Sequence, residues 1–551
     1  MKLCRFMKLS VAILLLTGMI ASTGCQAPAA TGAPTANSGG YNRNPAPAAT
    51  EAPSQQYEPS EDRKAEGEED GEGALNDDGL RYSTKRDRDN SDEDYQDIDE
   101  IGFRSPLRFP LSTFSVDPDS AAYSNIRRMI YDGDHVPKDA VRIEEMINYF
   151  HYDYPEPKGD DPFSVTTEYA NCPWNEDHEL LLVGIQAEEV SKQELPPSNL
   201  IFLLDVSGSM QDDNKLPLVK RAFRMLADRL GSNDTISIVT YASGVDIVLK
   251  GVKGNKKAKI MNAIEDLEAG GSTAGASGLE TAYDVAQDCF IEGGNNRVIM
   301  ATDGDFNVGP SSDAEMTRLI ERKLKTGVFL SVLGFGMGNL KDSKLESLAK
   351  NGNGNYAYID DITQARKVMV REMGGTLLTV AKDVKIQIEF NPAEVKGYRL
   401  IGYENNMLAD EDFNNDRVDA GEIGAGHRVT ALIEIIPANS SEQVSGSSLK
   451  YQTTEHTVSG EICTVSIRYK EPEGKKSRLM TIPVAGSILT MEPSGNFLFA
   501  SAVAEFGLLL RDSKYQGDAS WRAVIDRARK SSDDDLKDEF VDLVELARDY
   551  D

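Results

Sequence analysis

The alternation of apolar, strand-like runs with amphipathic helical segments between residues 199 and 372 constrains the fold most. The first such run, Leu200–Leu204, has the composition of a buried strand, and Val219, Phe223 and Leu226 recur just after it at helical spacing. A chain that repeats this order forms a largely parallel sheet covered by helices on both faces. The expected strands are 199–204, 235–241, 245–249, 297–302, 328–333 and 355–359. The expected helices are 215–230, 256–267, 275–290, 312–326, 342–350 and 362–372, with 245–249 as an antiparallel edge strand.

Oxygen-bearing side chains follow two of these strands. Asp205, Ser207 and Ser209 come directly after the first strand at every second position, and Asp303 follows strand 297–302. The glycine-rich segment 270–274 offers another hydroxyl. Open α/β sheets bind ligands beyond the carboxyl ends of their strands, and a hard divalent cation such as Mg²⁺ prefers oxygen ligands. The pattern therefore predicts a metal site at this edge of the sheet.

These residues together resemble the metal-ion-dependent adhesion site of the von Willebrand factor type A family. Asp205, Ser207 and Ser209 match the first loop of that site, Thr273 matches the second and Asp303 the third. The resemblance implies that the first three hold Mg²⁺ or Mn²⁺ directly, and that Thr273 and Asp303 bind it directly or through water. In that family an Asp or Glu of a protein partner commonly fills an open coordination position.

A longer resemblance covers residues 106–551. The block from Ser112–Asp117 through Arg142–Phe150 is similar to the N-terminal region of the bacterial YfbK-like von Willebrand factor type A proteins. Tyr398–Asn405 and Asp419–His427 resemble the C-terminal region of the same subfamily. The resemblance indicates the family without naming a biochemical role.

The regions that flank the α/β segment predict a second, antiparallel architecture. Residues 106–160 have a helical pattern, whereas 163–169 and 180–186 resemble strands that have too few local partners for a stable sheet. Further strands are expected at 383–390, 429–436, 463–469 and 479–484, and helices at 496–510, 521–528 and 536–547. We therefore predict an α/β plus β fold, in which a doubly wound, mostly parallel von Willebrand A sheet is inserted in or beside an antiparallel β-sandwich with N-terminal and C-terminal helices.

The N-terminus has the order of a targeting segment. A basic stretch, residues 1–8, is followed by a short apolar run over 9–20 and by small residues before Cys25. This order resembles a bacterial lipoprotein signal cleaved before Cys25, although Ser22 stands where that signal usually has Leu, Val or Ile. The alternatives are ordinary cleavage, which gives a secreted protein, and an uncleaved anchor. A lipid on Cys25 would place the protein at the cell envelope, in the outer membrane or on the outer face of the cell membrane.

Composition sets limits on partners and on domain organisation. The formal net charge of −31 makes nucleic acid an unsuitable partner, because nucleic-acid binding relies on basic patches. Ala, Pro, Gly, Ser and acidic residues dominate residues 26–105, and few large apolar side chains occur there, which predicts a disordered acidic linker. The expected divisions are a signal peptide at 1–24, the linker at 25–105, a helical and strand region at 106–196, the von Willebrand A domain at 197–373 and a β-sandwich with helices at 374–551.

Catalytic motifs are missing from the sequence. It contains no Gly-x-Ser-x-Gly, His-Glu-x-x-His or phosphate-binding loop motif, and its five histidines are scattered without metal-ligand spacing. The glycines at 334, 336 and 338 have the wrong spacing for a dinucleotide site and predict a turn on the metal-site face. We therefore expect a binding module, with neither catalytic nor cofactor-binding residues. A structural envelope scaffold, in which the metal only stiffens the loops, is the alternative, and a hydrolase is a third hypothesis.

Overall fold

The fold is described from a computed structural model. The described residues are 93, 95–116, 119–190, 195–272, 275–304, 313–337, 340–372, 378–444, 459–472 and 474–550. The signal peptide, Cys25, Thr273 and almost all of the acidic linker lie outside them, so the predictions made for these segments stay predictions.

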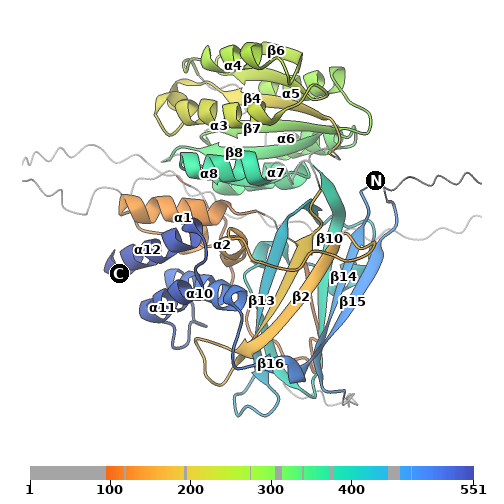
Figure 1. The fold of residues 1–551 in the computed structure, drawn as a ribbon, viewed down its shortest axis with the longest axis vertical. Coiled ribbons are helices and arrows are strands. Elements are labelled where there is room, and N and C mark those ends of the chain that lie inside the picture. The colour runs from red at the N-terminus through yellow and green to blue at the C-terminus, as the bar shows by residue number, and fades with distance from the viewer. Residues whose placement is uncertain are drawn as a thin grey trace, which may run out of the picture. The chain divides into compact units, whose positions relative to one another are not determined.

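The predicted α/β domain is present, and its sheet is largely parallel. Within the described residues, six strands form one sheet in the order β6-β5-β4-β7-β8-β9, and only β6 runs antiparallel, as predicted for the edge (Figure 1). These strands are β4 (Ser198–Asp205), β5 (Thr235–Tyr241), β6 (Val245–Lys253), β7 (Asn295–Thr302), β8 (Phe329–Phe335) and β9 (Tyr356–Ile359). Parallel β4 and β7 lie side by side at the centre, so their carboxyl ends meet at one edge.

Helices cover both faces of this sheet because successive strand residues point to opposite sides. Leu200, Phe202 and Leu204 pack in one core with α3 (Leu216–Arg229), α4 (Lys257–Glu265) and α8 (Ile362–Arg366). Ile201 and Leu203 pack in a second core with α5 (Gly275–Asp288), α6 (Asp313–Leu324) and α7 (Asp342–Asn351). Helix α8 is shorter than predicted, because residues Lys367–Glu372 continue it as a π-helical segment.

The predicted sandwich is also present, and it takes strands from both sides of the α/β domain. One sheet has the order β11-β13-β3-β2-β16, and the other has β1-β10-β14-β15 with β12 beside β10, among the strands that the structure describes. The first consists of β2 (Phe163–Asn171), β3 (Glu179–Ala187), β11 (Val395–Ile401), β13 (Arg428–Pro437) and β16 (Leu489–Thr490). The second consists of β1 (Leu111–Ser115), β10 (Thr379–Phe390), β12 (Gly421–Gly424), β14 (Glu461–Lys470) and β15 (Arg478–Ala485). Because β3 pairs with β13, the α/β domain is inserted between strands of the sandwich.

The prediction of helix throughout 106–160 is wrong for Leu111–Ser115. This segment is strand β1, which pairs antiparallel with β10, and Phe114 is completely buried between the two sheets. Helix begins afterwards, with α1 (Ala121–Asp132) and α2 (Ile143–Asn148), as the sequence predicted. The partner strand of β1 lies more than 260 residues away in sequence, so a local pattern does not contain the pairing that makes it a strand.

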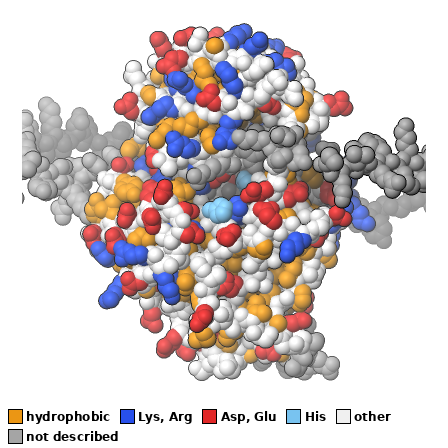
Figure 2. All heavy atoms as spheres, viewed as in Figure 1, with side chains coloured by type: hydrophobic (Ala, Val, Ile, Leu, Met, Phe, Trp, Pro, Cys, Tyr) orange, Lys and Arg blue, Asp and Glu red, His pale blue; other side chains and the backbone are white. Residues whose placement is uncertain are grey.

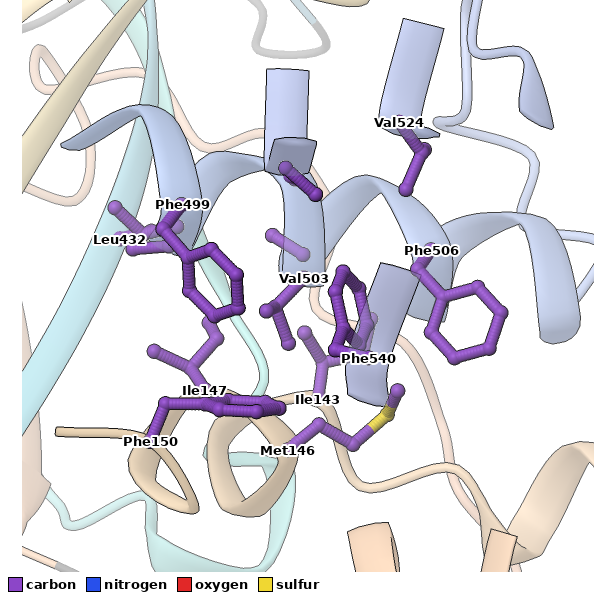
Figure 3. Close-up of a cluster of buried hydrophobic side chains, with 14 of the residues drawn as sticks. Ile143, Met146, Ile147, Phe150, Leu432, Phe499, Val503, Phe506, Val524 and Phe540 are labelled. Atoms are coloured by element: carbon purple, nitrogen blue, oxygen red, sulfur yellow. The ribbon is translucent and has the colours of Figure 1, made fainter. Parts of the chain in front are cut away.

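A third layer of helices covers the outer face of the first sheet. Helices α1 and α2 pack there with α10 (Gly495–Leu510), α11 (Trp521–Ser531) and α12 (Asp535–Tyr550). Figure 3 shows Phe150 of the N-terminal block among Phe499 and Phe540 of the C-terminal helices, with ring centroids 4.9 and 5.5 Å from that of Phe150. Leu432 of β13 reaches the same core. The N-terminal and C-terminal segments therefore form one helical layer.

Two buried ion pairs join the N-terminal helices to the α/β domain. Arg127 of α1 contacts Asp360, which follows β9, at 2.6 Å, and Arg142 contacts Asp342, the first residue of α7, at the same distance. Both arginine side chains are almost completely buried. Breaking such a pair would leave an unpaired charge buried away from water. These contacts therefore hold the α/β domain firmly to the helical layer.

Among the described residues, Cys172, Cys289 and Cys463 are free cysteines, and no disulfide joins them.

Candidate metal centre

The two predicted carboxylates lie at the same edge of the central sheet. Asp205 is the last residue of β4, and Asp303 directly follows β7, the parallel neighbour of β4. Both residues are completely buried. The fold therefore brings together two acidic side chains that are 98 positions apart in sequence, as the strand pattern predicted.

The first loop places its oxygen atoms close to Asp205. The Ser207 amide donates to Asp205 Oδ1 at 2.8 Å, and this bond turns the chain back over the strand end. The Ser207 and Ser209 hydroxyl oxygens lie 3.0 Å apart. Asp205, Ser207 and Ser209 are thus gathered in one turn, which ends in a short 3₁₀ segment, Gly208–Gln211.

The glycine-rich second loop packs against the first loop. The Gly270 amide donates to the carbonyl of Val206 at 2.8 Å, and the Gly208 amide donates to the carbonyl of Gly271 at 3.0 Å. Gly271 has φ of +87°, and a Cβ there would lie 2.4 Å from Ser243 Oγ, so this position requires glycine. Thr273 itself lies outside the described residues, and its role as a ligand stays a prediction.

Asp303 has a partner that the sequence analysis missed. Lys215, immediately before α3, donates from Nζ to Asp303 Oδ2 at 3.0 Å, and both side chains are buried. Thr302 was also missed, and its hydroxyl lies 3.4 Å from Asp205 Oδ2. The signal for Thr302 was its place beside Asp303 at a strand end. The signal for Lys215 was its position as a single lysine between the Asp205 loop and an amphipathic helix.

The electrostatics of the site disfavour the charge on Asp205. Burial raises the pKa of the Asp205 carboxyl from 3.8 to about 6, and the nearby charge of Asp303 acts in the same direction. Hydrogen bonds from Ser207 and from the Tyr241 hydroxyl oppose this rise in pKa. A buried carboxylate whose charge is disfavoured is stabilised by a bound cation, because the cation restores the lost solvation.

The donor set fits a hard divalent cation. It consists of oxygen atoms alone, from two carboxylates and at least two hydroxyls, which suits Mg²⁺ or Mn²⁺ better than a soft metal. Across the part of the chain that the structure describes, no cluster of three or more His, Cys, Asp or Glu is arranged to hold a metal. Among the described residues the candidate centre contains two of these, Asp205 and Asp303, so a metal held there would need further ligands such as the serine hydroxyls.

The residues described here include no helix that is both long and apolar enough to cross a membrane.

Family profiles match most of the chain. One described as von Willebrand factor matches residues 89–182, one described as von Willebrand factor type A domain matches 199–370, and one described as the C-terminal region of the uncharacterized protein YfbK matches 375–550. The second match contains all five predicted metal ligands.

The chain is also similar to individual proteins. The chain is 42% identical to the uncharacterized protein YfbK of Escherichia coli (strain K12) over 468 residues, which is 82% of this chain and 80% of that protein. It is 31% identical to the uncharacterized protein sll0103 of Synechocystis over 34% of this chain and 43% of that protein. A solved structure titled von Willebrand factor type A from Catenulispora acidiphila aligns with a TM-score of 0.39 and 16% identity, over 70% of this chain and 89% of that one.

Proposed function

Because this chain belongs to the YfbK family of von Willebrand factor type A domain proteins, we propose that it binds a protein partner through a divalent metal ion. Domains of this type generally mediate protein–protein interaction and commonly hold such an ion. The proposed ion is Mg²⁺ or Mn²⁺, and the proposed ligand from the partner is the carboxylate of an Asp or Glu. The family assignment gives no positive indication of an enzymatic activity.

One observation carries the proposal. Asp205 and Asp303 are both completely buried at one sheet edge, and the two serine hydroxyls of the Asp205 loop lie 3.0 Å apart beside them. Acidic side chains are rarely buried completely unless they are paired or hold a metal. Within the described residues Lys215 forms its ion pair with Asp303, and burial raises the pKa of Asp205 to about 6.

Each residue has a proposed task. Asp205, Ser207 and Ser209 hold the ion directly, and Thr273 and Asp303 complete its coordination directly or through water. The bound ion supplies a positive centre with an open position that an incoming carboxylate can occupy. Asp205, Asp303 and Thr302 are completely buried, and such surroundings of low dielectric constant strengthen the attraction between ion and carboxylate.

The partner has to approach an acidic protein. The net charge of −31 repels an acidic partner at long range. Figure 2 shows acidic and basic side chains interspersed over one face of the molecule, without a broad basic patch. We therefore propose a partner whose surface is basic around the carboxylate that binds the metal, or a partner held in the same assembly.

The proposed location is the cell envelope. The support is the order of basic, apolar and small residues before Cys25, which would receive a lipid and anchor the protein in the outer membrane or on the outer face of the cell membrane. The linker of residues 25–105 would then hold the folded region away from the membrane. The alternative function is a structural envelope scaffold in which the metal only stabilises the loops.

Metal titration tests the site. Isothermal titration of the purified protein with Mn²⁺ should show one site, and Asp205→Ala should abolish it. Asp213→Ala, which removes an exposed carboxylate from the same loop, is the matched control and should bind as the original protein does. Equal binding by the Asp205→Ala protein would sink the assignment.

Capture of a partner from envelope extracts distinguishes the proposed binding function from the alternative scaffold function. A partner that is retained with Mn²⁺ and released by EDTA supports the binding function, provided that the Asp205→Ala protein does not retain it. Retention that is the same with metal, with EDTA and with the Asp205→Ala protein supports the scaffold.

A further inference from the structure

Lys215 is a buried lysine that contacts the candidate metal centre directly. It precedes α3, ten residues after Asp205, and only 6% of its surface is exposed. Its ammonium group lies 3.0 Å from Asp303 Oδ2. Lysine is almost never buried without a charged or hydrogen-bonding partner, because its ammonium group is strongly hydrated in water.

The fold holds the stem of this lysine in place. Gly336, which follows β8, has φ of +76°, and a Cβ there would lie 2.4 Å from Lys215 Cε. The carbonyl of Gly336 accepts a hydrogen bond of 2.5 Å from the buried Tyr358 hydroxyl, which fixes that turn. Of the glycines for which a turn was predicted, Gly336 thus packs against the stem of Lys215, whereas Gly334 is still part of β8 and residue 338 lies outside the described residues.

The position of Lys215 determines the formal charge of the centre. Asp205 and Asp303 together neutralise a divalent ion, so without the lysine the loaded centre would have no net charge. With Lys215 beside Asp303, one positive charge remains. A neutral centre attracts a carboxylate only through the open position of the ion, whereas a positive centre attracts it by net charge as well.

We propose that Lys215 sets the charge of the metal centre, so that the site binds its ion less tightly and an anionic ligand more tightly. This inference rests on the proposed function and adds to it the residue that selects an anionic ligand. Lys215 acts through Asp303 and is a positioning and charge-setting residue, not a metal ligand.

The Lys215→Met protein tests the inference, because methionine retains an unbranched stem and removes the charge. Its dissociation constant for Mn²⁺ should fall by about tenfold, the order expected when a unit charge is removed beside a divalent ion in a medium of moderate dielectric constant. Lys220→Met, in the first turns of α3 and with a partly exposed side chain that donates to the carbonyl of Glu265, is the matched control and should change nothing.

The second readout uses acetate as the probe for the open position. Water-proton relaxation of the Mn²⁺-loaded protein reports coordinated water, which acetate should displace. The acetate concentration needed should be about tenfold higher in Lys215→Met than in the original protein, since one positive charge is lost. A role confined to packing would not tighten metal binding and weaken acetate binding at the same time.

A third variant distinguishes the loss of the Lys215 charge from misfolding of the protein. Lys215→Met leaves Asp303 without its ammonium partner and should lower the melting temperature in EDTA, whereas the double variant Lys215→Met, Asp303→Asn should regain most of that loss. Equal Mn²⁺ affinity in the original protein and in folded Lys215→Met overturns the inference alone. Absence of Mn²⁺ binding in both overturns the proposed function and this inference together.

Discussion

Replacing Asp205 by Asn is expected to stabilise the protein in EDTA while removing its response to metal. Burial, assisted by the charge of Asp303, raises the pKa of Asp205 from 3.8 to about 6. A rise of that size corresponds to ~3 kcal/mol of unfavourable free energy for the charged carboxylate at neutral pH. Asparagine keeps an oxygen that accepts from the Ser207 amide and carries no charge. The free energy of unfolding in EDTA should therefore rise by about 1–3 kcal/mol.

The pH dependence of this effect has a definite sign. The folded-state pKa of Asp205 lies above its unfolded value, so the protonated carboxyl contributes stability at low pH, and that contribution is lost as the pH rises through about 6. Asparagine is neutral at every pH, so the Asn variant does not lose this stability as the pH rises. The stability difference between the variant and the original protein should thus grow from about pH 4 to about pH 7 and stay constant above it.

Differential scanning calorimetry in EDTA across this pH range measures the effect, with the exposed Asp213→Asn as the control that should show no pH-dependent difference. Added Mn²⁺ should then raise the melting temperature of the original protein and leave that of Asp205→Asn unchanged, because an ion that binds only the folded state stabilises it. An Asp205→Asn protein that is less stable than the original in EDTA at neutral pH would refute the electrostatic reasoning, and so would a difference that does not vary with pH.

Three further predictions concern the junction, the second loop and the anchor. Arg142→Met should lower the free energy of unfolding by about 3–5 kcal/mol, because Asp342 is left buried without its ion pair, whereas the exposed Arg224→Met should cost less than about 1 kcal/mol; equal losses in urea denaturation would contradict this. Thr273→Ala should weaken Mn²⁺ binding in calorimetry without changing the melting temperature in EDTA, and unchanged affinity would remove Thr273 from the ligand set. Mass spectrometry should find a lipid-modified N-terminus at Cys25 and unprocessed precursor for Cys25→Ser; a mature N-terminus downstream would rule out the lipoprotein.

The α/β domain could be predicted from sequence because its signals are local. A buried parallel strand is a continuous apolar run, and a surface helix has apolar residues at regular spacing. The sequence alone therefore predicts a strand at Leu200–Leu204 and a helix over Val219–Leu226. The sandwich was predicted for a different reason: the strands at 163–186 lacked nearby partners and required others later in the chain. Strand β1 has no comparable local signal, since Leu111–Ser115 is short and becomes a strand only by pairing with β10.

The same distinction explains which site residues were predicted. Asp205, Ser207, Ser209 and Asp303 belong to chain segments that end strands, and strand ends converge at one edge whatever the surrounding packing. Lys215 was missed because its role depends on where a long side chain points, which is decided by the Gly336 turn more than a hundred residues later.

The arrangement links the charge at the candidate metal centre to the packing of the α/β domain against α1. Tyr358 of β9 fixes the Gly336 turn that holds Lys215, and the Arg128 guanidinium lies over the ring of Tyr358 at 5.8 Å. Arg128 belongs to α1, and it pairs with Glu93 at 2.8 Å. A change in how α1 packs against the α/β domain would therefore act first on the turn that positions Lys215. Of the candidate ligands, Asp205 is held by other contacts, from the Ser207 amide and from Tyr241, whereas Asp303 contacts Lys215 itself. A change at that junction should thus affect the Asp303 side of the candidate centre more than the Asp205 side.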